Sequence, residues 1–176
     1  MKRNYLAVSS LPVTLFSLLA LFSLPVYAET GIAVLDFELN DLTPMPRTPA
    51  ELERTASVAP LLREALAENG GYEVVIIDPE AQAEADAAFG YLFDHPELAA
   101  ELGRQFGADW IAIGRLHKPS FLFAYLKVLL VNVETQRIAG DYVVEVKGAG
   151  KKVIERGAAN LAEQIDQTVN RAAEDT

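Results

Sequence analysis

The feature that most constrains the fold is an apolar run of 13 residues, from Phe121 to Val133, which only Lys127 and Asn132 interrupt. The run is too short to cross a membrane as a helix, which needs about 20 apolar residues. Successive side chains of a strand point to opposite faces of a sheet, and both faces of this run are mostly apolar. The run therefore predicts a central strand in a sheet that is covered on both sides.

A second strand follows directly and should pair with the first. Residues 138–147 alternate between one set of apolar positions and a more polar set, as a half-exposed strand does. Thr135 and Gln136 lie between the two runs and provide the turn. We therefore expect a C-terminal antiparallel hairpin.

The preceding part of the chain alternates between short apolar runs and segments with helix-start signals. Thr48 with Pro49 and Glu51, and Asp78 with Pro79, have the residue types of helix N-termini. Pro44 and Pro46 predict a loop over residues 38–47, and Pro60 predicts a kink in the first helix. The expected strands are 32–37, 72–77, 110–114, 121–133 and 138–147; the expected helices are 49–69, a helix from 79, 96–106 and 152–173, with a break at 89–94.

These elements occur in the order β-α-β-α-α-β-β-β-α. A βαβ start implies right-handed parallel crossovers, and the hairpin adds antiparallel strands. We therefore predict a single α/β (mixed α+β) domain: a mixed sheet of about five strands, built from a βαβ unit plus the C-terminal hairpin, with helices packed on it.

The N-terminus has the pattern of a secretory signal. Lys2 and Arg3 precede an uncharged stretch over residues 5–28, and Val26-Tyr27-Ala28 fits a signal-peptidase site. We predict a signal peptide over residues 1–28 and a single periplasmic domain over 29–176, without a membrane span after cleavage. An uncleaved anchor is the alternative, since the stretch is long enough to span. The predicted location is the bacterial periplasm or the exterior.

Charge and cysteine content exclude several classes of function. The chain has 15 Lys and Arg against 25 Asp and Glu, a formal net charge of -10, and no cysteine. Disulfides, Cys-ligated zinc and thiol nucleophiles are therefore excluded. An acidic chain also lacks the basic surface that nucleic-acid binding requires, so no nucleic-acid partner is expected.

Several segments resemble bacterial envelope domains. Gly107–Leu116 is similar to a "Gly-Ala-Asp-aromatic" helix stop and strand found in the TolB amino-terminal, CsgG-type and LpoB-type domains. Leu62–Leu66 followed by Gly71–Val75 resembles their "helix, then Gly-aromatic-x-Val" unit, and Leu129–Thr135 looks like their hairpin strand. The resemblance implies a non-enzymatic envelope domain that binds other proteins.

A closer resemblance is to an uncharacterised family of predicted secreted bacterial proteins. The residues that carry it are Gly114–Ser120, Gly148 and Arg156-Gly157. Like the first resemblance, it covers most of the chain after residue 28.

One basic cluster stands out on this acidic chain and is our candidate partner patch. Arg115, His117 and Lys118, continued by Ser120, could attract an acidic partner. Tyr91 and Phe93, in the predicted break, are candidate aromatic anchors. The alternative is that the bases balance nearby acids at the end of a strand.

An acidic loop is a weaker candidate for metal binding. Asp36 ends the first predicted strand, where open α/β sheets carry ligands, and Glu38 and Asp41 follow it. Three carboxylates could hold a hard cation such as Ca²⁺. The spacing does not match an EF-hand, and a solvated acidic loop is the alternative.

We therefore expect an accessory domain that binds an envelope protein, without a cofactor and without catalysis. Two separate histidines, His95 and His117, do not suggest a catalytic constellation. The first alternative is an accessory to a periplasmic oxidation or export system, such as one serving quinoprotein dehydrogenases. The second is a small-molecule or metal-binding sensor that uses the acidic loop. The partner's identity and the oligomeric state stay open.

Overall fold

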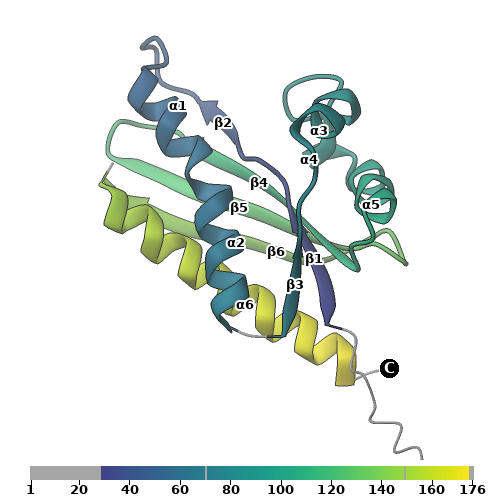
Figure 1. Ribbon diagram of the computed structural model, residues 1–176. Helices are drawn as coiled ribbons and strands as arrows, with labels where there is room; N and C mark the ends of the chain where they lie inside the picture. Colours follow the sequence, from purple (N-terminus) through teal and green to yellow (C-terminus); the bar gives the residue numbers. More distant parts are fainter. Residues whose placement is uncertain (1–28, 70, 149, 175–176) are drawn as a thin grey trace, which may run out of the picture.

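The computed structural model describes residues 29–69, 71–148 and 150–174, which form one sheet with helices on both faces (Figure 1). The strands follow the order β3-β1-β4-β5-β6, and β2 pairs with β4 beyond the end of β1. β1 pairs in parallel with β3 and β4, and the β4–β5 and β5–β6 pairs are antiparallel. The strands are β1 (Thr30–Val34), β2 (Glu38–Asp41), β3 (Tyr72–Val75), β4 (Trp110–Lys118), β5 (Phe123–Asn132) and β6 (Arg137–Lys147).

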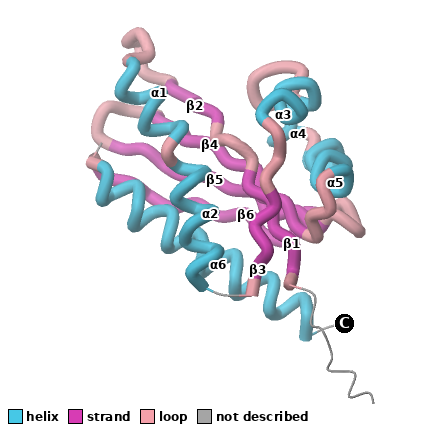
Figure 2. Tube along the Cα trace, viewed as in Figure 1, coloured by secondary structure: helices cyan, strands magenta, loops and turns pink. Residues whose placement is uncertain are grey.

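This arrangement confirms the predicted single mixed α/β domain with a βαβ unit and a C-terminal hairpin (Figure 2). The sheet has six strands in place of about five, because residues 38–41 form a strand. The helices are α1 (Pro49–Ala56), α2 (Val58–Asn69), α3 (Pro79–Ala85), α4 (Tyr91–Asp94), α5 (Pro96–Gln105) and α6 (Lys151–Glu174).

The sheet separates two hydrophobic cores. α2 and α6 cover one face, where Leu62, Leu66, Leu161 and Ile165 are fully buried against β4 and β5. α3, α4 and α5 cover part of the other face, over a smaller core that includes Ile111 (Figure 1). The even-numbered residues of β4 and β5 face the first core and the odd-numbered ones face the second, as the period of a strand requires.

Two tyrosine hydroxyls tie α6 to the sheet. Tyr72 on β3 donates to Asp166 Oδ1 at 2.9 Å, and Tyr142 on β6 donates to Thr168 Oγ1 at 2.7 Å. Burial, and then the Asp166 carboxylate, raise the pKa of Tyr72, so its hydroxyl stays protonated as a donor. These bonds set where α6 lies along the sheet.

The predicted loop over residues 38–47 is wrong for its first four residues. Val34 lies opposite Ala112, and Glu38 lies opposite Arg115. The chain between Val34 and Glu38 therefore has one residue more than β4 has between Ala112 and Arg115. The extra residue makes an interruption like a β-bulge. The Phe37 ring there packs over the backbone of Gly114.

Three further expectations change in detail. The predicted kink at Pro60 is a break at Ser57, because α2 starts at Val58 and Pro60 falls in its first turn. The predicted break at 89–94 contains the short helix α4. Phe121 and Leu122, expected in the central strand, lie before β5 in the turn after Pro119.

The predicted signal peptide, residues 1–28, lies outside the described residues. Within the described ranges, no helix is long and apolar enough to cross a membrane.

We predict that Gly114→Ala destabilises the domain by about 1–3 kcal/mol, the usual cost of overpacking. An added Cβ would lie 2.2–2.4 Å from three ring atoms of Phe37, so the ring would have to leave its position. Urea unfolding of both proteins measures the loss. Gly150→Ala is the matched control, because nothing lies within 4 Å of a Cβ there. Equal stability of Gly114→Ala and the wild-type chain would show that the packing of the Phe37 ring on Gly114 does not contribute to the free energy of unfolding.

Candidate partner-binding site

The structure divides the predicted basic patch between the two faces of the sheet. Arg115 and His117 are odd-numbered residues of β4 and lie on the α3–α5 face, whereas Lys118 lies on the face of α1 and α2. One partner surface cannot contain all three side chains. Each therefore has to be described in its own surroundings.

Arg115 is fixed by an acid and two aromatic rings. Its Nη2 donates to Glu38 Oε2 at 3.2 Å, and its guanidinium lies 4.3 Å from the ring centroid of Phe93 and 5.2 Å from that of Phe89. Glu38 Oε1 also accepts from the Gly90 N–H at 2.6 Å. Arg115 and Phe93 thus hold the α4 segment against β2 and β4, and Phe93 is half-buried by this contact.

The two other aromatic or imidazole candidates of this face have local partners. The Tyr91 ring packs against that of His95 in a tilted arrangement, with the ring centroids 4.6 Å apart. The His117 ring lies 6.5 Å from that of Tyr125 on β5. Burial, and then the charges of Lys127 and Arg115, lower the pKa of His117 below its ordinary 6.5, so the ring is neutral at neutral pH. His117 therefore adds no positive charge to a patch at neutral pH.

Lys118 is buried between two carboxylates. Its Nζ lies 3.1 Å from Asp41 Oδ2 and also contacts Glu51 Oε1. Asp41 accepts the Thr43 N–H at 2.9 Å, and Glu51 accepts the Thr48 N–H at 3.1 Å as part of a capping box. Lys118 thus links β4 to β2 and α1, and its charge is matched inside the fold.

The acidic residues predicted as a weak metal site are not brought together. Asp36 Oδ1 lies 3.1 Å from Arg63 Nη2, while Glu38 and Asp41 pair with Arg115 and Lys118. Within the described ranges, no group of three His, Cys, Asp or Glu side chains is placed to hold a metal ion. Each of the three carboxylates therefore balances a different cation.

An exposed apolar surface lies where β4 leads into β5, directly after Ser120 of the predicted patch. Phe121 is 65% exposed and Leu122 is 74% exposed, and Phe123 at the start of β5 is also exposed. Ser120 Oγ accepts the N–H groups of Leu122 and Phe123 at 3.3 Å each. The Pro119-Ser120 pair was the available signal for this turn, because such residues favour turns over strands.

This apolar turn borders a pocket of about 150 Å³. Figure 1 shows the β4–β5 turn, α1 and the start of α6 at the same end of the molecule. Ala124 on β5 and Val146 on β6, both buried, are among its lining residues. The remaining lining residues are Glu51, Arg54, Lys118, Ser120, Phe121, Leu122, Phe123 and Gly148.

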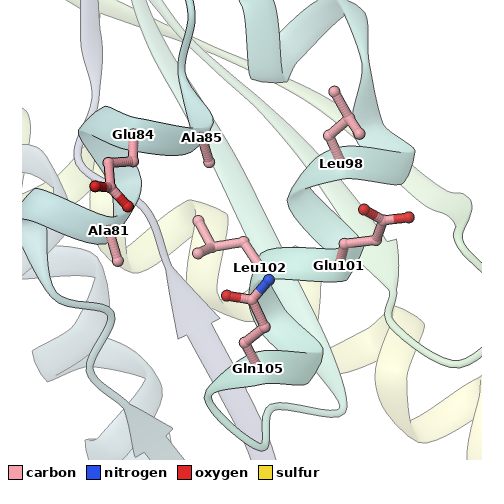
Figure 3. A pocket seen from close by; sticks show the side chains of 7 residues that line it. All are labelled: Ala81, Glu84, Ala85, Leu98, Glu101, Leu102 and Gln105. Atoms are coloured by element: carbon pink, nitrogen blue, oxygen red, sulfur yellow. The ribbon is translucent and has the colours of Figure 1, made fainter.

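A second hollow, of about 310 Å³, lies between α3 and α5 (Figure 3). Ala81, Ala85 and Leu102 give it apolar walls, and Glu84 and Glu101 stand at its sides. The two carboxylates point away from each other in Figure 3, so they do not form a converging acid pair.

The fold and this site define the class: a mixed α/β domain with a small, partly apolar surface pocket and its charged candidates mostly paired internally. The family model DUF3280, described as "Protein of unknown function (DUF2380)", matches residues 30–165. The match spans most of the chain, so the chain belongs to this family. The expected uncharacterised family is thereby confirmed.

Solved structures of several bacterial proteins resemble this chain, including the following three. TolB from Acinetobacter baumannii is 14% identical with a TM-score of 0.51, over 81% of this chain and 28% of that one. A PelC dodecamer from Paraburkholderia phytofirmans is 12% identical with a TM-score of 0.50, over 75% and 83%. The LpoB C-terminal domain from Escherichia coli is 18% identical with a TM-score of 0.49, over 73% and 90%. At these identities the likeness to TolB and PelC shows the fold alone. No curated protein matches the sequence.

We predict that Asp41→Asn lowers the free energy of unfolding at pH 7 by about 1–3 kcal/mol. Burial alone would raise the pKa of Asp41, but hydrogen bonding from Thr43 and the charge of Lys118 hold that pKa below its ordinary 3.8. The contribution of Asp41 is therefore complete above about pH 4 and is lost as the pH falls through the lower folded-state pKa.

Denaturant unfolding between about pH 7 and pH 2 measures this difference, which should shrink below about pH 4. Glu53→Gln, at an exposed acid on α1, is the control and should follow the wild-type curve. A difference that stays constant across the whole pH range would show that Asp41 does not act through its charge.

Proposed function

We propose that this protein is a non-enzymatic accessory domain of the bacterial cell envelope, periplasmic or secreted, that acts by binding another protein. The observation that carries the proposal is the exposed apolar turn, which we define as Phe121, Leu122 and Phe123. Adjacent large apolar side chains on the surface of an acidic, otherwise well-packed domain are typical of an interaction site.

The apolar turn is held in place, which favours binding. Ser120 fixes its backbone, as described above. The Lys118 ammonium lies 5.6 Å from the Phe121 ring centroid, and the Lys147 ammonium lies 6.0 Å from that of Phe123. A surface that is already ordered loses less conformational entropy when a partner docks. Aromatic anchors of this kind supply much of the affinity at interfaces.

The shared fold supports a role in an envelope assembly. TolB and PelC have this fold, and the PelC structure is a dodecamer. The sequence resemblance to envelope domains points in the same direction. Binding is favoured over catalysis because His95 pairs with Glu97 and His117 packs beside Tyr125. Both rings thus have structural surroundings.

We predict that a photo-crosslinking residue placed at Leu122 of the full chain, in its own host, captures one predominant protein of the envelope. Leu122 projects from the turn and should lie at the centre of the interface. Mass spectrometry identifies the captured protein. The matched control is the same residue at Ile76, which is apolar and 62% exposed but follows β3.

The captured protein then allows an affinity measurement. Phe121→Ser with Leu122→Ser should weaken binding at least about tenfold, as expected when anchors are lost, and Ile76→Ser should change it less than about twofold. Capture at Ile76 equal to that at Leu122, or unchanged affinity of the double variant, would contradict the proposed surface.

A further inference from the structure

Arg54 on α1 differs from the other half-buried arginines in its lack of a hydrogen-bond partner. Its Nε and Nη2 are enclosed by the protein and make no hydrogen bond within the described part of the chain. By contrast, Arg63 pairs with Asp36 and donates to Val34 O. Arg115 pairs with Glu38 through Nη2, and only its Nε lacks a hydrogen bond there. Burial lowers the pKa of Arg54. An enclosed charge without a partner is costly, so its presence calls for a physical reason.

The two acids that contact Lys118, which lines the same pocket as Arg54, already have partners. Glu51, one turn earlier on α1, accepts from Lys118 and from Thr48. Asp41 accepts from Lys118 and from Thr43. The two carboxylates therefore satisfy Lys118 and the local backbone, and the Arg54 guanidinium has no carboxylate bonded to it.

Arg54 lines the 150 Å³ pocket beside the apolar turn. The pocket thus combines a guanidinium that lacks an acceptor, the buried apolar side chains of Ala124 and Val146, and the exposed apolar side chains of Phe121 and Leu122. The chemistry that fits all three parts is an anionic group attached to an apolar segment.

We propose that this pocket receives a carboxylate of the partner protein, which Arg54 binds while an adjacent apolar side chain of the partner packs on the apolar turn. The inference rests on the proposed function, since it names the chemistry recognised at the same surface. A guanidinium forms paired hydrogen bonds with a carboxylate, which matches the unused donors of Arg54.

The charge of the chain distinguishes a single carboxylate from a polyanion. With a net charge of -10, the protein repels nucleic acids and strongly anionic membranes at long range. A lone carboxylate in an apolar segment avoids most of this repulsion and gains a short-range bond. Because Nε and Nη2 of Arg54 are buried in the free domain, the carboxylate reaches them only when side chains that line the pocket move.

The first test measures directly whether small carboxylates bind to the domain that starts at residue 29. The Nε–H resonance of Arg54 is followed by NMR in protein labelled with ¹⁵N-arginine. N-acetylleucine, which has a terminal carboxylate beside an apolar side chain, should shift this resonance saturably with a Kd on the order of 1 mM. The α-amide of N-acetylaspartate, whose one free carboxylate is in its side chain, tests whether a side-chain carboxylate binds in the same way. N-acetylleucinamide, which lacks a carboxylate, should cause no shift.

The second test separates a binding role from a structural one. Arg54→Met retains the aliphatic stem and removes the enclosed charge, so the Tm of the free domain should stay the same or rise. Binding of N-acetylleucine, detected through the backbone amides of residues 120–124, should be lost. Arg63→Met is the matched control for a structural arginine and should lower the Tm, because Asp36 and Val34 O lose their donor.

The absence of a carboxylate-dependent shift at Arg54 would overturn the inference, and so would a fall in Tm for Arg54→Met as large as that for Arg63→Met. Binding to phosphatidylglycerol vesicles through Phe121 and Leu122, without a carboxylate-dependent shift, would also overturn it in favour of a lipid surface. If Arg54→Met keeps full affinity for the protein captured at Leu122, the carboxylate inference fails while the proposed function stands. If capture at Leu122 fails but the shift is seen, the proposed protein-binding function fails, and what remains is a pocket that binds a carboxylate from another source.

Discussion

The structure depends on the hydrogen bonding of both edges of β4. This strand runs for nine residues, and β5 pairs with nearly all of one edge. On the other edge β1 pairs only as far as Ala112, and β2 continues the pairing from Arg115 to Lys118 after the interruption at Phe37. Buried backbone groups need partners, so β4 can extend this far only because β2 is added. This pairing places basic side chains of β4 next to acidic side chains of β2 and α1, with which they form ion pairs.

Most of the fold follows from apolar periodicity. The run after Ser120 and the alternation in residues 138–147 predicted the hairpin, and the helix-start signals at Thr48 and Asp78 predicted α1 and α3. β2 was missed because it is polar, and a polar strand gains its stability from pairing that no local pattern records. The acidic residues within 38–41 and the basic residues within 115–118 are evident in the sequence, but the strand register that pairs them is not.

The candidate site was only partly accessible to sequence reasoning for a similar reason. Arg115 and Lys118 are close in sequence, yet their odd and even positions on β4 place them on opposite faces. Arg54 carried no sequence signal, because its distinguishing property is the absence of a hydrogen-bond partner for enclosed nitrogens. That property is determined by the three-dimensional arrangement, in which Glu51 and Asp41 pair with Lys118.

Two kinds of interaction have different effects at the proposed interface. The apolar turn supplies contact area, which raises the affinity for any apolar partner but discriminates only weakly between such partners. Arg54 supplies selection, because an apolar or amide-bearing segment docked over it would leave its charge enclosed and unneutralised. A carboxylate removes that penalty, so it discriminates by more than the modest net strength of its own hydrogen bonds. An unpaired arginine beside an ordered aromatic turn is therefore a means of rejecting wrong partners as well as of holding the right one.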